Sequence, residues 1–187
     1  MNWTNYHTHS FYCDGSDNLE EYVKKAIDRK MPVIGFSSHA SVPFPTGWNM
    51  NVIELPDYLN EIEALKVKYN NDIQIYKGLE IDYLKGKNIV FETIELISKS
   101  KCIIEINTHG VYKGLCKSFY PSGFILKECS NFGIPVTINA DAHHPDELNL
   151  FFNECATLLK KKGYKEIFIL INNEWLPKKF NENGILI

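Results

Sequence analysis

The stretch Asn5-Tyr6-His7-Thr8-His9-Ser10 places two histidines two residues apart near the start of the chain. We predict a β-strand here, and residues i and i+2 of a strand point to the same face. Both imidazoles would then enter one pocket, where each can bind a divalent metal at about 2.0–2.1 Å. The alternative is a hairpin or surface pair of histidines that binds no metal.

Other histidines also follow apolar, β-rich runs, and carboxylates accompany them. Imidazoles and carboxylates at the C-terminal ends of parallel strands are how an α/β barrel builds a polynuclear metal site. The pattern therefore favours a metallohydrolase. The residues concerned are His39, His109, His143 and His144, with Asp14, Glu80, Asp82, Glu105 and Asp141.

Two of these clusters are more telling than the others. Glu80 and Asp82 would share a face of a β-rich run, and a carboxylate there is costly to bury unless it is paired or bound to metal. Asp141 and His143 repeat the same-face spacing with one oxygen and one nitrogen donor. His144 would then point away, as a structural or solvent-facing residue.

The remaining candidates have ordinary explanations as well. Asp14 precedes Gly15, and Asp-Gly is a turn signal. His39 directly follows an expected buried strand, where a histidine often has a structural role, although it would lie at the same strand edge as His7. His109 stands where either a metal ligand or a substrate contact could lie.

Apolar runs alternate with helical patterns along the chain, which indicates βα units around a parallel sheet. We therefore expect a single α/β domain over residues 1–187 with about six strands, fewer than the eight of a standard barrel. The loop 40–52 is a candidate lid or pocket wall, and the tail 172–179 is expected to be poorly ordered. The expected strands are 5–10, 33–38, 73–81, 102–107, 135–139 and 166–170, and the expected helices are 18–30, 55–70, 88–99, 122–132 and 148–162.

Composition narrows the function classes. The 187 residues are 44% hydrophobic and 23% charged with a net charge of −3, which is typical of a soluble globular protein. There is no basic stripe for nucleic acid, no run long enough to cross a membrane and no signal peptide, so we expect a cytoplasmic protein. The five cysteines form no CxxC pair and are expected to be reduced thiols. The chain carries no GxSxG, GxGxxG or P-loop motif.

Seven short motifs, in order from residue 5 to about 165, resemble the PHP (polymerase and histidinol phosphatase) superfamily, and specifically its monofunctional histidinol-phosphatase branch. Each motif alone is weak, but their common order makes chance improbable. The motifs are Asn5-Tyr6-His7-Thr8-His9-Ser10, Cys13-Asp14-Gly15, Gly35-Phe36-Ser37-Ser38-His39, Gly78-Leu79-Glu80-Ile81-Asp82-Tyr83, Glu105-Ile106-Asn107-Thr108, Tyr120-Pro121-Ser122 and Asp141-Ala142-His143.

The resemblance implies a distorted barrel with up to three divalent metals (Zn, Mn or Fe) at the C-terminal strand ends. It implies hydrolysis of L-histidinol phosphate, a small phosphorylated metabolite, to L-histidinol and phosphate, with Asp141 handling a proton at the leaving alcohol. Glu80 would also bridge to a middle metal. The implied ligands are His7, His9, Glu80 and Asp141 for one metal, and Asp14, His39 and His143 for another.

The chain departs from this family in two ways. Two strands that supply histidines to the middle metal are missing, which leaves two complete sites, with His109 as a replacement candidate at the third. The family usually has Leu-Arg-Lys where this chain has Val111-Tyr112-Lys113. The phosphate-binding arginine is therefore absent, and Lys113 is a weaker, point-charge substitute. The shortened barrel must also cover its strand edges, for which a homodimer is one solution.

Three functions follow from the sequence. The first is a metal-dependent phosphomonoesterase of the histidinol-phosphatase type. The second is a degenerate protein that binds metal or phosphate without turnover. The third, an amidohydrolase-like or DNase-like HxH metallohydrolase, is disfavoured by the motif around Glu80, the spacing of Asp14 and His39, and the lack of a basic groove.

Overall fold

The computed structural model describes residues 3–40, 46–80, 94, 97–99 and 102–186. Within the chain two compact units are distinguished, and each is described by itself. The first consists of Met1–Tyr83 and Ala140–Leu150, and the second of Leu84–Asn139 and Phe151–Ile187. In the described part, no helix combines the length and apolar character needed to cross a membrane.

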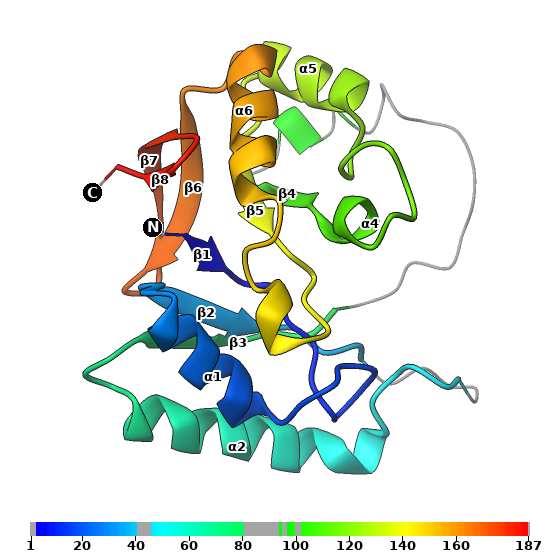
Figure 1. Ribbon diagram of the computed structural model, residues 1–187, viewed down its shortest axis with the longest axis vertical. Coiled ribbons are helices and arrows are strands. Elements are labelled where there is room, and N and C mark those ends of the chain that lie inside the picture. Colours follow the sequence, from blue (N-terminus) through cyan, green and yellow to red (C-terminus); the bar gives the residue numbers. More distant parts are fainter. Residues whose placement is uncertain (1–2, 41–45, 81–93, 95–96, 100–101, 187) are drawn as a thin grey trace. The chain divides into compact units, whose positions relative to one another are not determined.

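The first unit is built on a parallel sheet in the order β1-β2-β3. Its strands pair in the register Thr4↔Val33 and Ile34↔Ile75. α1 and α2 lie on the same side of the β2–β3 pair (Figure 1). The strands are β1 (Thr4–Asn5), β2 (Val33–Phe36) and β3 (Gln74–Lys77), and the helices are α1 (Leu19–Asp28), η1 (Val52–Glu54), α2 (Leu55–Lys68) and η2 (Pro145–Glu147).

Apolar periodicity explains the helices of this unit. The buried face of α1 carries Leu19, Tyr22 and Val23, at the spacing of an amphipathic helix. The Asn18 side chain caps α1 by accepting the Glu21 backbone N–H, which satisfies one of the free donors of the first turn. Both helices agree with the sequence prediction.

The second unit combines a parallel pair with an antiparallel sheet. β4 pairs with β5 from Ile104↔Val136 to Asn107↔Asn139, and β6, β7 and β8 form the antiparallel sheet. The predicted helix 88–99 lies mostly outside the described residues. The elements are β4 (Ile104–Asn107), α4 (His109–Tyr112), α5 (Gly123–Asn131), β5 (Val136–Asn139), α6 (Phe152–Lys162), β6 (Glu166–Ile171), β7 (Glu174–Asn181) and β8 (Gly184–Ile185).

Two expectations about the fold need correction. The tail 172–179 is not poorly ordered, because most of it belongs to β7, which pairs with β6 from Ile171↔Glu174 to Glu166↔Lys179. Asn172 and Asn173 both have positive φ, the backbone of a tight hairpin turn that asparagine tolerates. The α/β class is confirmed, but the described strands form three small sheets and do not close into one barrel.

Candidate metal centre

All seven predicted metal ligands belong to the first unit. His7 and His9 follow β1, His39 follows β2, and Glu80 follows β3. These strands are parallel, so their C-terminal ends meet at one edge of the sheet. A bridge between His39 and Glu80 continues the β2–β3 pairing to the ligands themselves.

Backbone pairing brings the last two ligands, Asp141 and His143, to the same edge. The segment between them runs parallel to the end of β1 through a bridge between Thr8 and Ala142. The His9 N–H donates to the Ala142 carbonyl at 2.8 Å, and the Ala142 N–H donates to the His7 carbonyl at 3.1 Å. The Asp-x-His segment is therefore locked to the His-x-His segment by main-chain hydrogen bonds.

The first ligand group consists of His7, His9, Glu80 and Asp141. The Nε2 atoms of His7 and His9 are 3.1 Å apart, and each lies within 3.3 Å of Glu80 Oε2. Asp141 Oδ1 is 2.9 Å from His9 Nε2. Two ligands of a tetrahedral zinc are about 3.4 Å apart, so these separations fit donors that share one divalent ion.

The second ligand group consists of His9, Asp14, His39 and His143. Asp14 Oδ1 lies 3.2 Å from both His143 Nε2 and His9 Nδ1. His39 Nε2 is 3.9 Å from Asp14 Oδ2. The His9 ring stacks on the His143 ring with centroids 4.0 Å apart. His9 thus belongs to both groups, with Nε2 facing the first and Nδ1 facing the second.

The charges in the centre fit a bound cation. Burial opposes ionisation of Glu80, yet hydrogen bonds from His7 and His9 lower the pKa of this carboxyl to about 2. Burial also opposes the charged form of His9, but hydrogen bonds to Asp14 and Asp141 raise the pKa of its imidazole well above the usual range. Without metal, bound protons balance the carboxylates. A divalent ion would supply the same positive charge, so the donor set fits a metal.

Asp141 has an unusual backbone. Its φ is +54°, in the left-handed region that residues other than glycine seldom adopt. Asp and Asn tolerate this region better than most residues, and strain of this kind is concentrated at functional sites. The left-handed turn occurs directly between the buried strand β5 and the segment that pairs with β1.

Residues after His143 hold that ligand in place. The Glu147 carboxylate accepts the backbone N–H groups of His143 and His144 at 2.9 and 3.1 Å. Arg29 donates to the Asp146 carbonyl and to the Asn149 side chain, which ties the same turn to α1. His144 is 49% exposed and caps η2 by accepting the Asp146 N–H, as expected of a structural residue.

The predicted substrate contacts His109 and Lys113 belong to the second unit. His109 begins α4, its N–H donates to Asn107 Oδ1 at 2.8 Å, and its Nδ1 is 3.0 Å from the Tyr112 hydroxyl. The Lys113 ammonium lies over the Tyr112 ring. Their roles in substrate binding stay predictions. Glu105 accepts a hydrogen bond from Asn139 within this unit, and Asp82 lies outside the described residues.

Three residues outside the predicted ligand set also lie near the ligands. The Trp48 ring meets the His39 ring edge to face with centroids 4.7 Å apart, within the loop expected to form a pocket wall. The Cys13 thiol lies 3.4 Å from His9 Nδ1. Tyr58 reaches the same region from α2, with its hydroxyl 3.0 Å from the Gly78 carbonyl. A lone aromatic residue on a helix or loop carries no sequence signal for such a contact.

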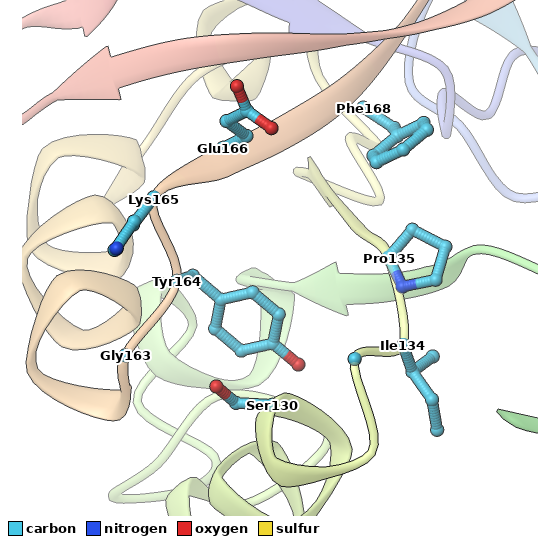
Figure 2. A pocket seen from close by; sticks show the side chains of 9 residues that line it. Ser130, Ile134, Pro135, Gly163, Tyr164, Lys165, Glu166 and Phe168 are labelled. Carbon is cyan, nitrogen blue, oxygen red and sulfur yellow. The ribbon is translucent and has the colours of Figure 1, made fainter.

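The second unit contains a separate cavity of about 310 Å³ (Figure 2). It lies near the C-terminal end of α5 and the starts of β5 and β6, and Ser130, Pro135, Tyr164 and Phe168 are among its lining residues. None of the predicted metal or substrate ligands lines it. The predicted ligands and this cavity are therefore separate features of the described residues.

Comparison with known proteins supports one family. The PHP domain family model matches residues 5–185. The histidinol-phosphatase of Bacillus subtilis (strain 168) is 32% identical over 87 residues, which are 42% of this chain and 32% of that protein. The Lactococcus lactis histidinol-phosphatase is 33% identical over 82 residues, 43% of this chain and 30% of that protein. The matches thus span about a third of these curated relatives.

A solved structure shares the fold. The Lactococcus lactis histidinol phosphate phosphatase, solved in complex with zinc, L-histidinol and phosphate, superposes with a TM-score of 0.74 at 18% identity. The superposition covers 100% of this chain and 99% of that one. At this identity the likeness establishes the fold alone, and the chemistry must come from the residues of the present chain.

Proposed function

Because the chain belongs to the PHP domain family, we propose that it is a metal-dependent phosphomonoesterase of the histidinol-phosphatase type. It would convert L-histidinol phosphate and water to L-histidinol and phosphate. The observation that carries the proposal is the pair of ligand groups that share His9. The proposal includes that the whole chain acts as one PHP domain with a shortened barrel.

The donor set supports two divalent metals, with zinc, manganese and iron as candidates. His7, His9, Glu80 and Asp141 would hold one, and Asp14, His39 and His143 the other. Bound metal would supply positive charge that stabilises the phosphoryl oxygens in the transition state and lowers the pKa of the attacking water. The zinc, histidinol and phosphate bound to the Lactococcus lactis protein are consistent with this choice.

Asp141 is the proposed proton donor to the leaving alcohol. Its side chain is 19% exposed, and its Oδ1 lies 2.9 Å from His9 Nε2 and 3.6 Å from His7 Nε2. The two imidazoles fix the carboxyl group, and the left-handed backbone directs it to the strand edge. A carboxylate in this position could take the proton that the attacking water loses and pass it to the leaving alkoxide as the phosphorus–oxygen bond breaks.

Phosphate recognition would rely on the metals. The 187-residue sequence contains one arginine, Arg29, and its guanidinium holds the turn after His143. We propose that Lys113 and His109 supply the remaining contacts to the substrate. The single arginine also favours the second candidate function, a protein of the same family that binds metal and phosphate without turnover.

One experiment separates these functions. The purified chain is loaded with Zn²⁺, Mn²⁺ or Fe²⁺, its metal content is measured, and phosphate release is followed from histidinol phosphate and from p-nitrophenyl phosphate. We expect about two metals per chain and turnover of histidinol phosphate, with His39→Ala as the inactive control. Bound metal without turnover on either substrate would reject the enzyme and leave the binding protein.

Thermal unfolding gives an independent measurement. We expect inorganic phosphate to raise Tm of the metal-loaded protein but not of the EDTA-treated protein, because no guanidinium is available to bind the anion by itself. Equal stabilisation of both forms would show that phosphate binds outside the metal centre.

A further inference from the structure

One backbone hydrogen bond of the β2–β3 ladder is missing directly before two metal ligands, and a side-chain hydroxyl takes its place. Beyond the strands, the Gly78 N–H donates to the Phe36 carbonyl at 2.7 Å. Two residues later the Glu80 N–H donates to the Ser38 carbonyl at 3.1 Å. In a regular parallel pair the intervening bond would run from the Ser38 N–H to the Gly78 carbonyl, since parallel ladders are evenly spaced.

The Tyr58 hydroxyl takes the place of that bond. Ser38 and Gly78 are both described, and in place of a direct bond the Ser38 N–H donates to the Tyr58 oxygen at 3.3 Å. The same hydroxyl donates to the Gly78 carbonyl at 3.0 Å. One oxygen atom from α2 therefore satisfies a donor and an acceptor of two neighbouring strand ends, and holds those ends further apart than a direct bond would.

Both strand ends carry ligands immediately afterwards. His39 follows Ser38 and belongs to the second ligand group, whereas Glu80, two residues after Gly78, belongs to the first. His39 Nδ1 lies 3.1 Å from Glu80 Oε2. The separation of the strands at Tyr58 thus sets where these two ligands stand relative to each other.

The surroundings make Tyr58 a rigid spacer. Its side chain is fully buried, so the hydroxyl cannot exchange its partners for solvent. The Tyr12 ring meets it edge to face at 5.4 Å, and the Tyr12 hydroxyl donates to Glu61 of the same helix at 2.8 Å. Tyr12 is two residues before Asp14, so α2 also supports the segment that carries a third ligand.

From this geometry we infer that Tyr58 is a positioning residue that sets the spacing between the two metal groups. The inference rests on the proposed metal site. Tyr58 touches no ligand side chain in the described contacts and acts through the main chain of Ser38 and Gly78. Removing its hydroxyl leaves those two groups either unpaired or free to bond directly, and either outcome displaces His39 from Glu80.

The test compares Tyr58→Phe with Tyr69→Phe. Tyr69 caps the end of α2, and its hydroxyl donates to Glu20 at 2.6 Å, away from every ligand segment. Each EDTA-treated protein is titrated with Co²⁺, and affinity and the visible spectrum are recorded. We expect Tyr58→Phe to lower the affinity for the more weakly bound Co²⁺ ion by about tenfold or more, as removal of outer-sphere partners does. The visible spectrum should change as well. Tyr69→Phe should leave both unchanged.

The outcomes are distinct. Wild-type affinities and spectra in Tyr58→Phe would overturn the positioning role alone. A wild-type chain that binds Co²⁺ but never releases phosphate would overturn the proposed activity and leave the positioning role standing, and one that binds no Co²⁺ would overturn both. If Tyr58→Phe does not fold, NMR of the metal-free wild type decides: a slowly exchanging Tyr58 hydroxyl proton close to the Ser38 amide supports its place between the strand ends, and its absence there rejects it.

Discussion

His9 Nδ1 lies 3.2 Å from Asp14 Oδ1, while its Nε2 faces the other ligand group. A carboxylate beside the second nitrogen of a metal-binding imidazole fixes the ring's tautomer and orientation. Asp14 therefore has two functions, as a ligand of one proposed metal and as the partner of a ligand of the other. The two metal sites are expected to depend on each other through this pair.

Asp14→Asn tests this dependence. We expect the substitution to lower the metal affinity of both ligand groups. The affinity of the first group should fall by about tenfold, because His9 loses its orienting carboxylate. Isothermal titration with Zn²⁺ measures both affinities. Asp17→Asn is the matched control, because Asp17 lies in the same loop but outside both ligand groups. An Asp14→Asn protein with unchanged affinity at the first site would show that the sites are independent.

Asp141→Asn separates proton transfer from backbone geometry. At saturating metal we expect kcat for phosphate release to fall by about 10²–10⁴. Asparagine tolerates the left-handed backbone at φ +54°, so in the metal-free protein the substitution should remove the ion pair with His9 without adding backbone strain. Asp141→Ala should lower the free energy of unfolding by about 1–2 kcal/mol more than Asp141→Asn, because alanine does not tolerate the left-handed backbone. An unchanged kcat in Asp141→Asn would exclude the proton role.

Trp48 should report metal at the second ligand group. Its ring lies 4.7 Å from the His39 ring, close enough for a paramagnetic ion to quench its fluorescence. We expect Co²⁺ to quench part of the emission of the wild type, and Trp175→Phe, a substitution on β7, is the control that should keep this component. Trp48→Phe should lose this component. Quenching that persists in Trp48→Phe would place the ion elsewhere.

Because Tyr22 is buried, we predict that the folded protein loses stability at alkaline pH. Burial raises the pKa of Tyr22 to about 12, so the folded state holds its proton above the usual pKa near 10. The raised pKa stabilises the folded state by up to about 2–3 kcal/mol. This stabilisation is complete below pH 10 and is lost as the pH rises towards 12. The free energy of unfolding, measured with urea between pH 8 and 11, should therefore fall less steeply for Tyr22→Phe than for the wild type. Parallel curves for the two proteins would contradict the shift.

Much of the ligand set could be predicted from the sequence, because it depends on local rules. The i, i+2 spacing of His7 and His9 and the apolar run before Asp141 are visible without a structure. In the structure all seven expected ligands lie in one unit, within two groups. Their assignment as ligands stays a prediction until metal is measured.

What the sequence did not reveal depends on contacts between distant residues. Tyr58 is one of ten tyrosines, and only the packing of α2 under the strand ends brings its hydroxyl to Ser38 and Gly78. The hairpin at Asn172 was overlooked because a polar pair between apolar residues is typical of both a tight turn and a loose tail. The distorted, shortened barrel was implied by the family resemblance, which does not determine how the strands of this chain associate into sheets.

The first unit is discontinuous in sequence, because the chain leaves it after Tyr83 and returns at Ala140. The two further strands that the family resemblance leads us to expect between Glu80 and Glu105 would fall in that excursion. Evolution could therefore lengthen or shorten this insertion without altering any of the seven ligands, and only a metal that draws ligands from the insertion would be lost. Such an arrangement allows related chains to differ in metal number while they keep the same two-site centre.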